Sequence, residues 1–131
     1  MNKAERSRLL STVGDSASEV IKTVGGGLAQ SLYVECLLHE LRLRGLNSRT
    51  NLVLPFNYKG LKPESLIVVP LFVDNEIPVD FVTGAANLPQ AVARMQVLLR
   101  LLNRLSGLVI DFHADPASGV HRVIAKKGER N

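Results

Sequence analysis

The chain is poor in aromatic residues and in cysteine. Its 131 residues include no tryptophan, two tyrosines, four phenylalanines and a single cysteine, Cys36. One cysteine excludes an internal disulfide framework, and its place in an apolar helical stretch predicts a buried thiol in a reducing compartment. Six aromatic rings are few for a platform on which nucleic-acid bases would stack. These shortages disfavour a disulfide-stabilised secreted domain and a base-stacking protein.

Long apolar runs are missing as well. No run approaches the roughly 20 apolar residues that cross a bilayer, and residues 1–8 are too polar and charged for a signal peptide. We therefore expect a soluble, cytoplasmic protein that makes no membrane contact. The length fits a single domain, residues 1–131, with residues 1–8 and 126–131 frayed at its two ends.

Positive charge is in modest excess. The net charge is +4 and the pI is about 9.6, with the basic residues spread along the chain. Such a balance suits a polyanionic partner without requiring one. If the protein binds nucleic acid, the candidate phosphate contacts are Arg42, Arg44, Arg100, Arg104, Lys126 and Lys127.

Apolar periodicity predicts two helices in the first third of the chain. The first spans residues 9–24 and ends at the three glycines 25–27. The second runs from about residue 28 to residue 44, with Gly45 just beyond its end. Its apolar side is expected to contain Leu28, Leu32, Cys36 and Leu37.

The rest of the chain predicts five strands and one further helix. A strand over residues 51–57 is followed by residues 66–82, which read as two strands joined at Asp74, Asn75 and Glu76. Asn87 and Pro89 then open a helix that ends at Ser106 and Gly107. The last strands cover residues 108–112 and 120–125. The order helix, helix, three strands, helix, two strands (ααβββαββ) predicts a single α/β (α+β) domain.

Several short motifs resemble a known family. Residues 27–33 read GLAQSLY, and they are followed by Glu35, Leu37, residues 40–42 and 44–46, Leu54-Pro55 and Tyr58-Lys59-Gly60. In this order and spacing they resemble the GxxExxY family, small bacterial and archaeal proteins of the PD-(D/E)XK nuclease superfamily. Gln30 stands where the naming motif has its glutamate. The resemblance covers roughly residues 11–125 and implies a mixed central sheet flanked by helices.

The resemblance also implies where catalytic residues would lie. It places the family's first metal-binding aspartate on Pro70, its acidic partner on Asp80 and its lysine on Val82. Hydrolysis of a phosphodiester with Mg²⁺ needs at least two acidic ligands and a lysine. Since Asp80 stands alone, the resemblance implies a dismantled site without a cofactor. The vestigial positions are Gln30, Tyr33, Pro70, Asp80, Val82 and Gln96, the last on the glutamine of the family's third helix.

A side chain from elsewhere in the sequence would restore the site. The candidates are Asp74, Glu76 and Glu64 for the missing acid and Lys59 and Lys62 for the lysine. With such replacements the protein would be a divergent Mg²⁺-dependent nuclease or a nucleic-acid-binding module. We favour an inactive protein, because replacements must hold geometry within about half an ångström.

Several of these residues also have a purely structural interpretation. Asp80 can be a strand-end acid that accepts a backbone hydrogen bond, and Tyr33 can be a packing residue. Gln96 either contacts Gln30 or Asp80, or faces solvent. Pro70 in an apolar strand predicts an edge strand or a bulge. Three histidines lie too far apart to form a metal-ligand motif: His39, His113 and His121.

The third helix is unusually apolar. Over residues 91–105 its apolar side chains cover roughly 220° of the circumference, about twice the stripe of an ordinary surface helix. A second subunit, or the two N-terminal helices of the same chain, would cover the additional side. We predict a homo-oligomer with Val97, Leu101 and Leu105 at the interface. The sequence thus favours an inactive nuclease-fold protein that acts as a self-associating structural or protein-interaction module.

Overall fold

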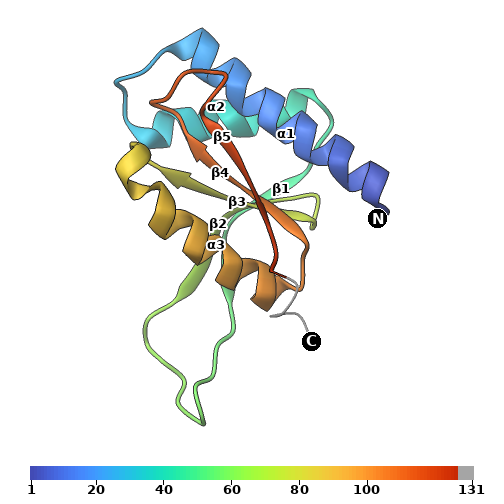
Figure 1. Ribbon diagram of the computed structural model, residues 1–131, viewed down its shortest axis with the longest axis vertical. Helices are drawn as coiled ribbons and strands as arrows, with labels where there is room; N and C mark the ends of the chain where they lie inside the picture. The colour runs from blue at the N-terminus through green and yellow to red at the C-terminus, as the bar shows by residue number, and fades with distance from the viewer. Residues whose placement is uncertain (127–131) are drawn as a thin grey trace.

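Two long helices open the chain. The computed structural model describes residues 1–126, and Figure 1 shows α1, Lys3–Val24, packed alongside α2, Gln30–Leu43. The predicted ends of both helices are confirmed, because each is followed by a glycine with positive φ, Gly25 at 80° and Gly45 at 79°. Among the described residues, no helix combines the length and apolar character that a membrane span requires.

The start of α1 lies earlier than predicted. The helix begins at Lys3 rather than at residue 9, because the Asn2 side chain accepts the N–H of Glu5 at 2.8 Å and caps the first turn. Residues 3–8, which we expected to be frayed, are therefore helical. Of the C-terminal residues expected to be frayed, 126–131, only Lys126 lies within the described part of the chain.

The buried face of α2 differs from the predicted one. Tyr33, Leu37 and Leu41 are fully buried, whereas Leu28 and Leu32 are 48% and 40% exposed. Leu28 lies in the loop before the helix, so it does not belong to the helical stripe. The line of residues at every fourth position from Tyr33 faces the sheet instead, because it carries the largest uninterrupted apolar surface.

The five strands form one mixed sheet in sequence order. They are β1 (Ser48–Leu54), β2 (Ile67–Val73), β3 (Ile77–Val82), β4 (Ser106–Asp111) and β5 (Val120–Ile124). β3 and β4 are parallel and the other neighbours are antiparallel. The predicted element order and mixed sheet are confirmed, and the parallel pair is joined by the crossover that such pairs require.

The first strand begins three residues earlier than predicted. Asn47 and Asp74 form two hydrogen bonds with each other just before β1. The Asn47 N–H donates to Asp74 Oδ1 at 2.8 Å, and the Asp74 N–H donates to the Asn47 carbonyl at 2.8 Å. Strand pairing therefore begins at the next residue, where Ser48 faces Val73. The predicted turn between β2 and β3 is confirmed, with Asp74 and Asn75 at φ 50° and 56°.

α3, Leu88–Leu102, crosses from β3 to β4 after a 3-10 turn, η1, Ala85–Asn87. Its predicted end at Ser106 and Gly107 is wrong. The helix ends at Leu102, because Asn103 takes the left-handed conformation (φ 55°) that asparagine tolerates.

Gly107 belongs to β4 and has a packing role there. A Cβ on Gly107 would lie 2.5 Å from the Met95 sulfur and 3.0 Å from the Pro78 carbonyl oxygen. Only glycine lets α3 approach the sheet this closely.

The two faces of the sheet carry separate cores. α1 and α2 cover one face, where their buried residues pack against Leu71, Phe81 and Ile110 among others. α3 covers the other face, and the base of the β1–β2 hairpin packs beside it through Leu52 and Leu54. The alternative in which both N-terminal helices cover the second side of α3 is therefore wrong, because they lie across the sheet from it.

The ladder between β1 and β2 is irregular at Pro70. β2 lies between β1 and β3, so Pro70 is not in an edge strand. The register skips the pair formed by Pro70 and Asn51, and Asn51 has a positive φ of 53°. Val69 and Phe72, three positions apart, both pack under α3. The strand therefore loses its alternation at Pro70, in keeping with the expected bulge, and beyond it the hairpin projects from the body of the molecule (Figure 1).

Candidate active site

Asp80 lies in β3 and directs its carboxylate at α3. It is 4% exposed. Its Oδ1 accepts the N–H of Phe81 at 2.8 Å, in agreement with a backbone-bonded acid. Its Oδ2 lies 2.6 Å from Nε of Arg94, a residue that the sequence analysis did not single out. Both carboxylate oxygens are thus engaged by the protein itself.

The arginine of this pair reaches from the inside of the fold to its surface. The side chain of Arg94 is 48% exposed, against 6% for that of Asp80. A carboxylate buried to this extent is stable as an ion only if a cation and hydrogen-bond donors compensate its lost hydration. Arg94 supplies the cation and Phe81 supplies a backbone donor. The pair therefore explains why a lone acid is tolerated inside an apolar strand.

The two other positions that the resemblance assigns to a metal-bound acid and a lysine are Pro70 and Val82, in the strands on which Asp80 lies or borders. Leu71 faces Val79 at the end of the β2–β3 ladder, and Pro70 and Asp80 are the next residues along the two strands. Val82 follows two residues later on the same face and is 7% exposed, within the core under α3. Pro70 and Val82 thus supply neither a second carboxylate nor a lysine beside Asp80.

A magnesium ion does not fit these residues. Mg²⁺ takes oxygen ligands in octahedral geometry and is reluctant to lose water, so a single carboxylate that is already paired with arginine is a poor site. The neighbouring strand offers Asp111, which is 6% exposed, but its Oδ1 accepts the N–H of His113 at 2.9 Å. Within residues 1–126, no three histidine, cysteine or acidic side chains are grouped as metal ligands.

The candidate replacements for the missing acid are held elsewhere. Asp74 bonds to Asn47, and Glu76 lies 3.4 Å from Nε of Arg104; both acids are at the turn before β3. Glu64 is exposed in the projecting hairpin.

The candidate replacements for the lysine lie in the same hairpin. Lys59 stacks over Tyr58 with 5.4 Å between Nζ and the ring centroid, and Lys62 lines a hollow with Phe56. The fold therefore does not bring these lysines to Asp80.

Tyr33 acts as a packing residue. Its ring stacks on Phe112 with centroids 5.1 Å apart. Its hydroxyl donates to the Gly25 carbonyl at 2.6 Å and accepts the Leu28 N–H at 3.0 Å. Tyr33 thus connects the core to the loop between α1 and α2, residues 25–29, which we call the glycine-rich loop.

Gln96 follows neither of its two expected arrangements. Its Nε2 donates to the Ile124 carbonyl at 2.8 Å, and its Oε1 accepts the Lys126 N–H at 3.1 Å. The amide therefore binds the outer edge at the end of β5 in the way that a neighbouring strand would.

Gln30 lines a small polar cavity beside the Asp80–Arg94 pair. The cavity has a volume of about 290 Å³ and lies where α2 begins, β3 ends and α3 begins. We call it the Arg94 cavity; it is lined by Gln30, Phe81, Val82, Thr83, Asn87, Gln90 and Arg94. The fold thus brings Gln30 and Val82 together next to Arg94, while Tyr33 and Gln96 serve other contacts.

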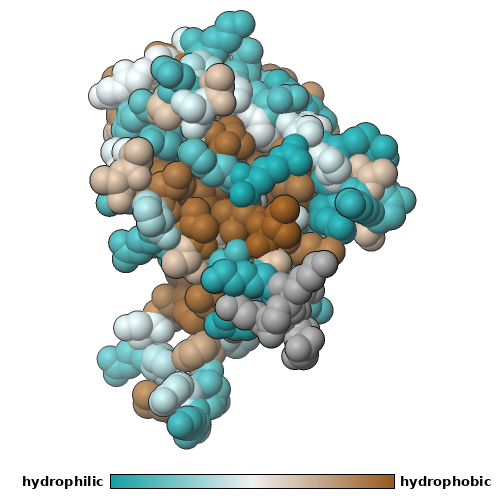
Figure 2. Space-filling model, in the orientation of Figure 1, coloured by the Kyte–Doolittle hydropathy of each residue, from teal (hydrophilic) through white to brown (hydrophobic). Residues whose placement is uncertain are grey.

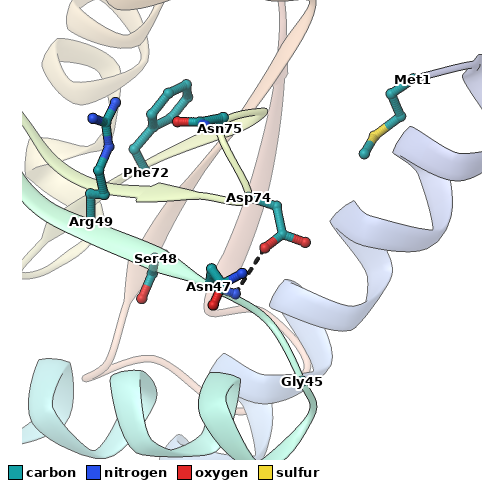
Figure 3. Close-up of a pocket in the computed structure, with 8 residues that line it drawn as sticks. All are labelled: Met1, Gly45, Asn47, Ser48, Arg49, Phe72, Asp74 and Asn75. Atoms are coloured by element: carbon teal, nitrogen blue, oxygen red, sulfur yellow. Dashed lines mark hydrogen bonds between the residues drawn. The ribbon is translucent and has the colours of Figure 1, made fainter.

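A larger hollow lies at the far end of β2 and β3. Figure 3 shows Arg49 beside Phe72, and Asp74 bonded to Asn47, around a space of about 510 Å³. The one carboxylate in its lining is committed to that backbone contact. This hollow lies next to the β2–β3 turn, so it does not extend the Asp80 site.

The candidate phosphate contacts are spread over the fold. Arg42 and Arg44 end α2, and Arg44 pairs with Glu40 at 2.9 Å. On α3 and just after it, Arg100 and Arg104 follow, with Arg104 donating to the Asn75 carbonyl at 2.9 Å. Lys126 follows β5, and Lys127 lies outside the described residues. None of the five described side chains lines the Arg94 cavity.

One comparison with known proteins found a match, and it agrees with the fold. The family model of the PD-(D/E)XK nuclease superfamily matches residues 7–123. No curated protein and no solved structure matches the chain.

Proposed function

Since the chain belongs to the PD-(D/E)XK nuclease superfamily, we propose that it keeps the fold of these enzymes without their metal-dependent catalysis. We propose further that it acts as a self-associating structural or protein-interaction module. The GLAQSLY segment supports a finer placement in the GxxExxY family.

The observation that carries the proposal is the contact between Asp80 and Arg94. The guanidinium lies 2.6 Å from the carboxylate oxygen to which a metal ion would bind. A divalent cation would have to displace this guanidinium and would then meet its positive charge. Removing one partner of such a partly buried pair costs roughly 1 to 3 kcal/mol. Asp80 is thus stabilised in a contact that competes with metal binding.

Exposed apolar side chains support self-association. Leu101, on α3, is 36% exposed, and Val97 lies half-buried one turn before it on the same helix. Leu105, three residues beyond the end of α3, is 41% exposed. The projecting hairpin adds large apolar side chains that the sequence analysis did not foresee: Val53, Phe56, Tyr58, Leu61 and Leu66. Figure 2 shows apolar residues gathered across the middle of one face of the molecule. A second copy that covers such surfaces would remove them from water.

A sizing experiment tests the self-association. Light scattering at micromolar concentration should give a mass of at least two chains for the unmodified protein, and Leu101→Glu should lower it by placing a charge in the interface. The matched control is Leu43→Glu, because Leu43 is 69% exposed at the end of α2, across the sheet from α3. A monomer in the unmodified protein contradicts self-association.

A cleavage assay tests the loss of catalysis. Neither single-stranded nor duplex DNA should be cut in the presence of Mg²⁺ or Mn²⁺. Cleavage that disappears in Asp80→Ala would establish instead the divergent Mg²⁺-dependent nuclease. Salt-dependent DNA binding without cleavage would support a nucleic-acid-binding module, the remaining alternative.

A further inference from the structure

The Arg94 cavity has the lining of an anion site. Its polar side chains are two glutamines, a threonine, an asparagine and an arginine, and no carboxylate lines it. The asparagine, Asn87, donates its Nδ2 to the Thr83 carbonyl at 2.7 Å, so the donors that serve a ligand come from the other four. Amides, hydroxyls and guanidinium groups all donate hydrogen bonds to oxygen. The lining therefore suits a negatively charged ligand rather than a cation.

Arg94 presents unused donors to this cavity. Asp80 occupies only its Nε, and among residues 1–126 neither Nη atom has a protein partner. Because Nε is bound to a buried carboxylate, the terminal N–H groups of the guanidinium are directed away from Asp80. A fixed guanidinium fork is the geometry with which arginine binds phosphate or carboxylate.

The arrangement of the donors distinguishes between these two anions. Gln30 approaches from α2, Thr83 from the end of β3, and Gln90 and Arg94 from α3. A tetrahedral anion presents oxygens in several directions and so suits donors that come from three elements, whereas a carboxylate offers two oxygens in one plane. The volume of about 290 Å³ lies at the lower limit of ligand pockets, which begin at about 300 Å³. The ligand is therefore small.

We propose that the Arg94 cavity binds a phosphate group, either as inorganic phosphate or as the terminal phosphate of an oligonucleotide. This proposal rests on the proposed function, because the same Asp80–Arg94 contact that opposes a metal ion also orients the arginine. Asp80 offsets part of the arginine charge, so the affinity for phosphate alone is weak.

Amide chemical shifts of the full-length protein test the proposal. Inorganic phosphate should shift the backbone amides of Gln30, Thr83 and Gln90 along a saturable curve, and acetate at the same ionic strength should shift them at least several-fold less. Gln90→Glu places a negative charge in the cavity and should abolish the response. Gln90 lies in the first turn of α3, where a glutamate is favourable for the helix, so this variant stays folded.

The matched control is Asn57→Asp. It makes the same change of charge at the tip of the projecting hairpin, and aspartate keeps the acceptor oxygen that binds the Gly60 N–H at 2.8 Å. Its phosphate response should equal that of the unmodified protein. Absence of saturable shifts at the cavity, an equal response to acetate, or an unchanged response in Gln90→Glu would overturn the proposal.

Two further titrations identify the source of the phosphate and separate the two proposals. If a 5′-phosphorylated dinucleotide binds more tightly than both inorganic phosphate and the 5′-hydroxyl dinucleotide, the ligand is the end of a nucleic acid. If inorganic phosphate binds as tightly as the phosphorylated dinucleotide, the ligand is the free ion.

Mn²⁺ should leave the amide signals near Asp80 unbroadened. Broadening of these signals by Mn²⁺ would refute the loss of the metal site. If neither Mn²⁺ nor phosphate changes the amide signals, only the anion site is refuted.

Discussion

The two faces of the sheet are covered to different extents. On one face, α1 and α2 enclose a core in which Phe112 stacks between Tyr33 and Phe81, with centroids 5.1 and 5.5 Å away. On the other face, α3 and the base of the hairpin enclose a core that includes the Asp80–Arg94 contact at its margin and leaves Leu101 36% exposed. The first face therefore serves stability. The proposed functions belong to the second, where polar groups and apolar surface remain accessible.

A matched pair of leucine truncations should show the largest difference between the two faces. Leu37→Ala, at a fully buried position of α2, should lower the free energy of unfolding by about 3 kcal/mol, because it leaves a cavity in the core. Leu101→Ala on α3 should lower it by less than about 1 kcal/mol. Urea denaturation measures both values, under conditions in which the protein is a monomer. Equal losses would show that α3 is as enclosed as α2.

A double-mutant cycle at Asp80 and Arg94 should show a change in the free energy of unfolding of intermediate size. Arg94→Gln should lower the free energy of unfolding by about 2 kcal/mol, because it leaves the buried Asp80 carboxylate without a cation. Adding Asp80→Asn should recover much of this loss, since an amide does not require a counter-charge. The coupling energy from chemical denaturation measures the contact. A coupling energy near zero would mean that the pair is as weak as an exposed surface ion pair.

The smallest expected change in stability comes from a substitution on the face of the sheet that α1 and α2 cover. Tyr33→Phe keeps the stacked ring and removes the hydroxyl that bonds to the glycine-rich loop, so it should cost about 1 kcal/mol. Tyr58→Phe makes the same change at a 56% exposed position and should change thermal stability by less than half as much. Similar melting temperatures for the two variants would show that the loop is not fastened through Tyr33.

Local features could be predicted from the sequence with good accuracy. The turn between β2 and β3 was foreseen, because Asp74 and Asn75 are residue types that take the positive φ angles of a tight hairpin. The end of α1 was foreseen from its glycines. The end of α3 was misplaced, since Gly107 resembles a helix stop and is instead required by close packing against Met95.

Contacts between distant residues could not be predicted in the same way. Arg94 and Asp80 are 14 residues apart, and Gln96 and Ile124 are 28 apart. In the sequence Arg94 is an ordinary polar residue within an amphipathic helix. Its role follows only when the crossover places α3 over β3. That Pro70 carries no carboxylate and Val82 no amine could be read directly, because the chemistry of a side chain is known without coordinates.

The sequence alone determined the order of the elements, their turns and the residue types beside Asp80, with no acid at Pro70 and no lysine at Val82, because these depend on backbone preferences and side-chain chemistry within a few positions. Only the tertiary structure decided that Asp80 is held by Arg94, that Gln96 binds the end of β5 and that Tyr33 rather than Leu32 faces the core. Those outcomes depend on which surfaces meet when the whole chain buries its apolar area. Which surfaces are buried depends on all the helices and strands at once, so no short stretch of sequence indicates it.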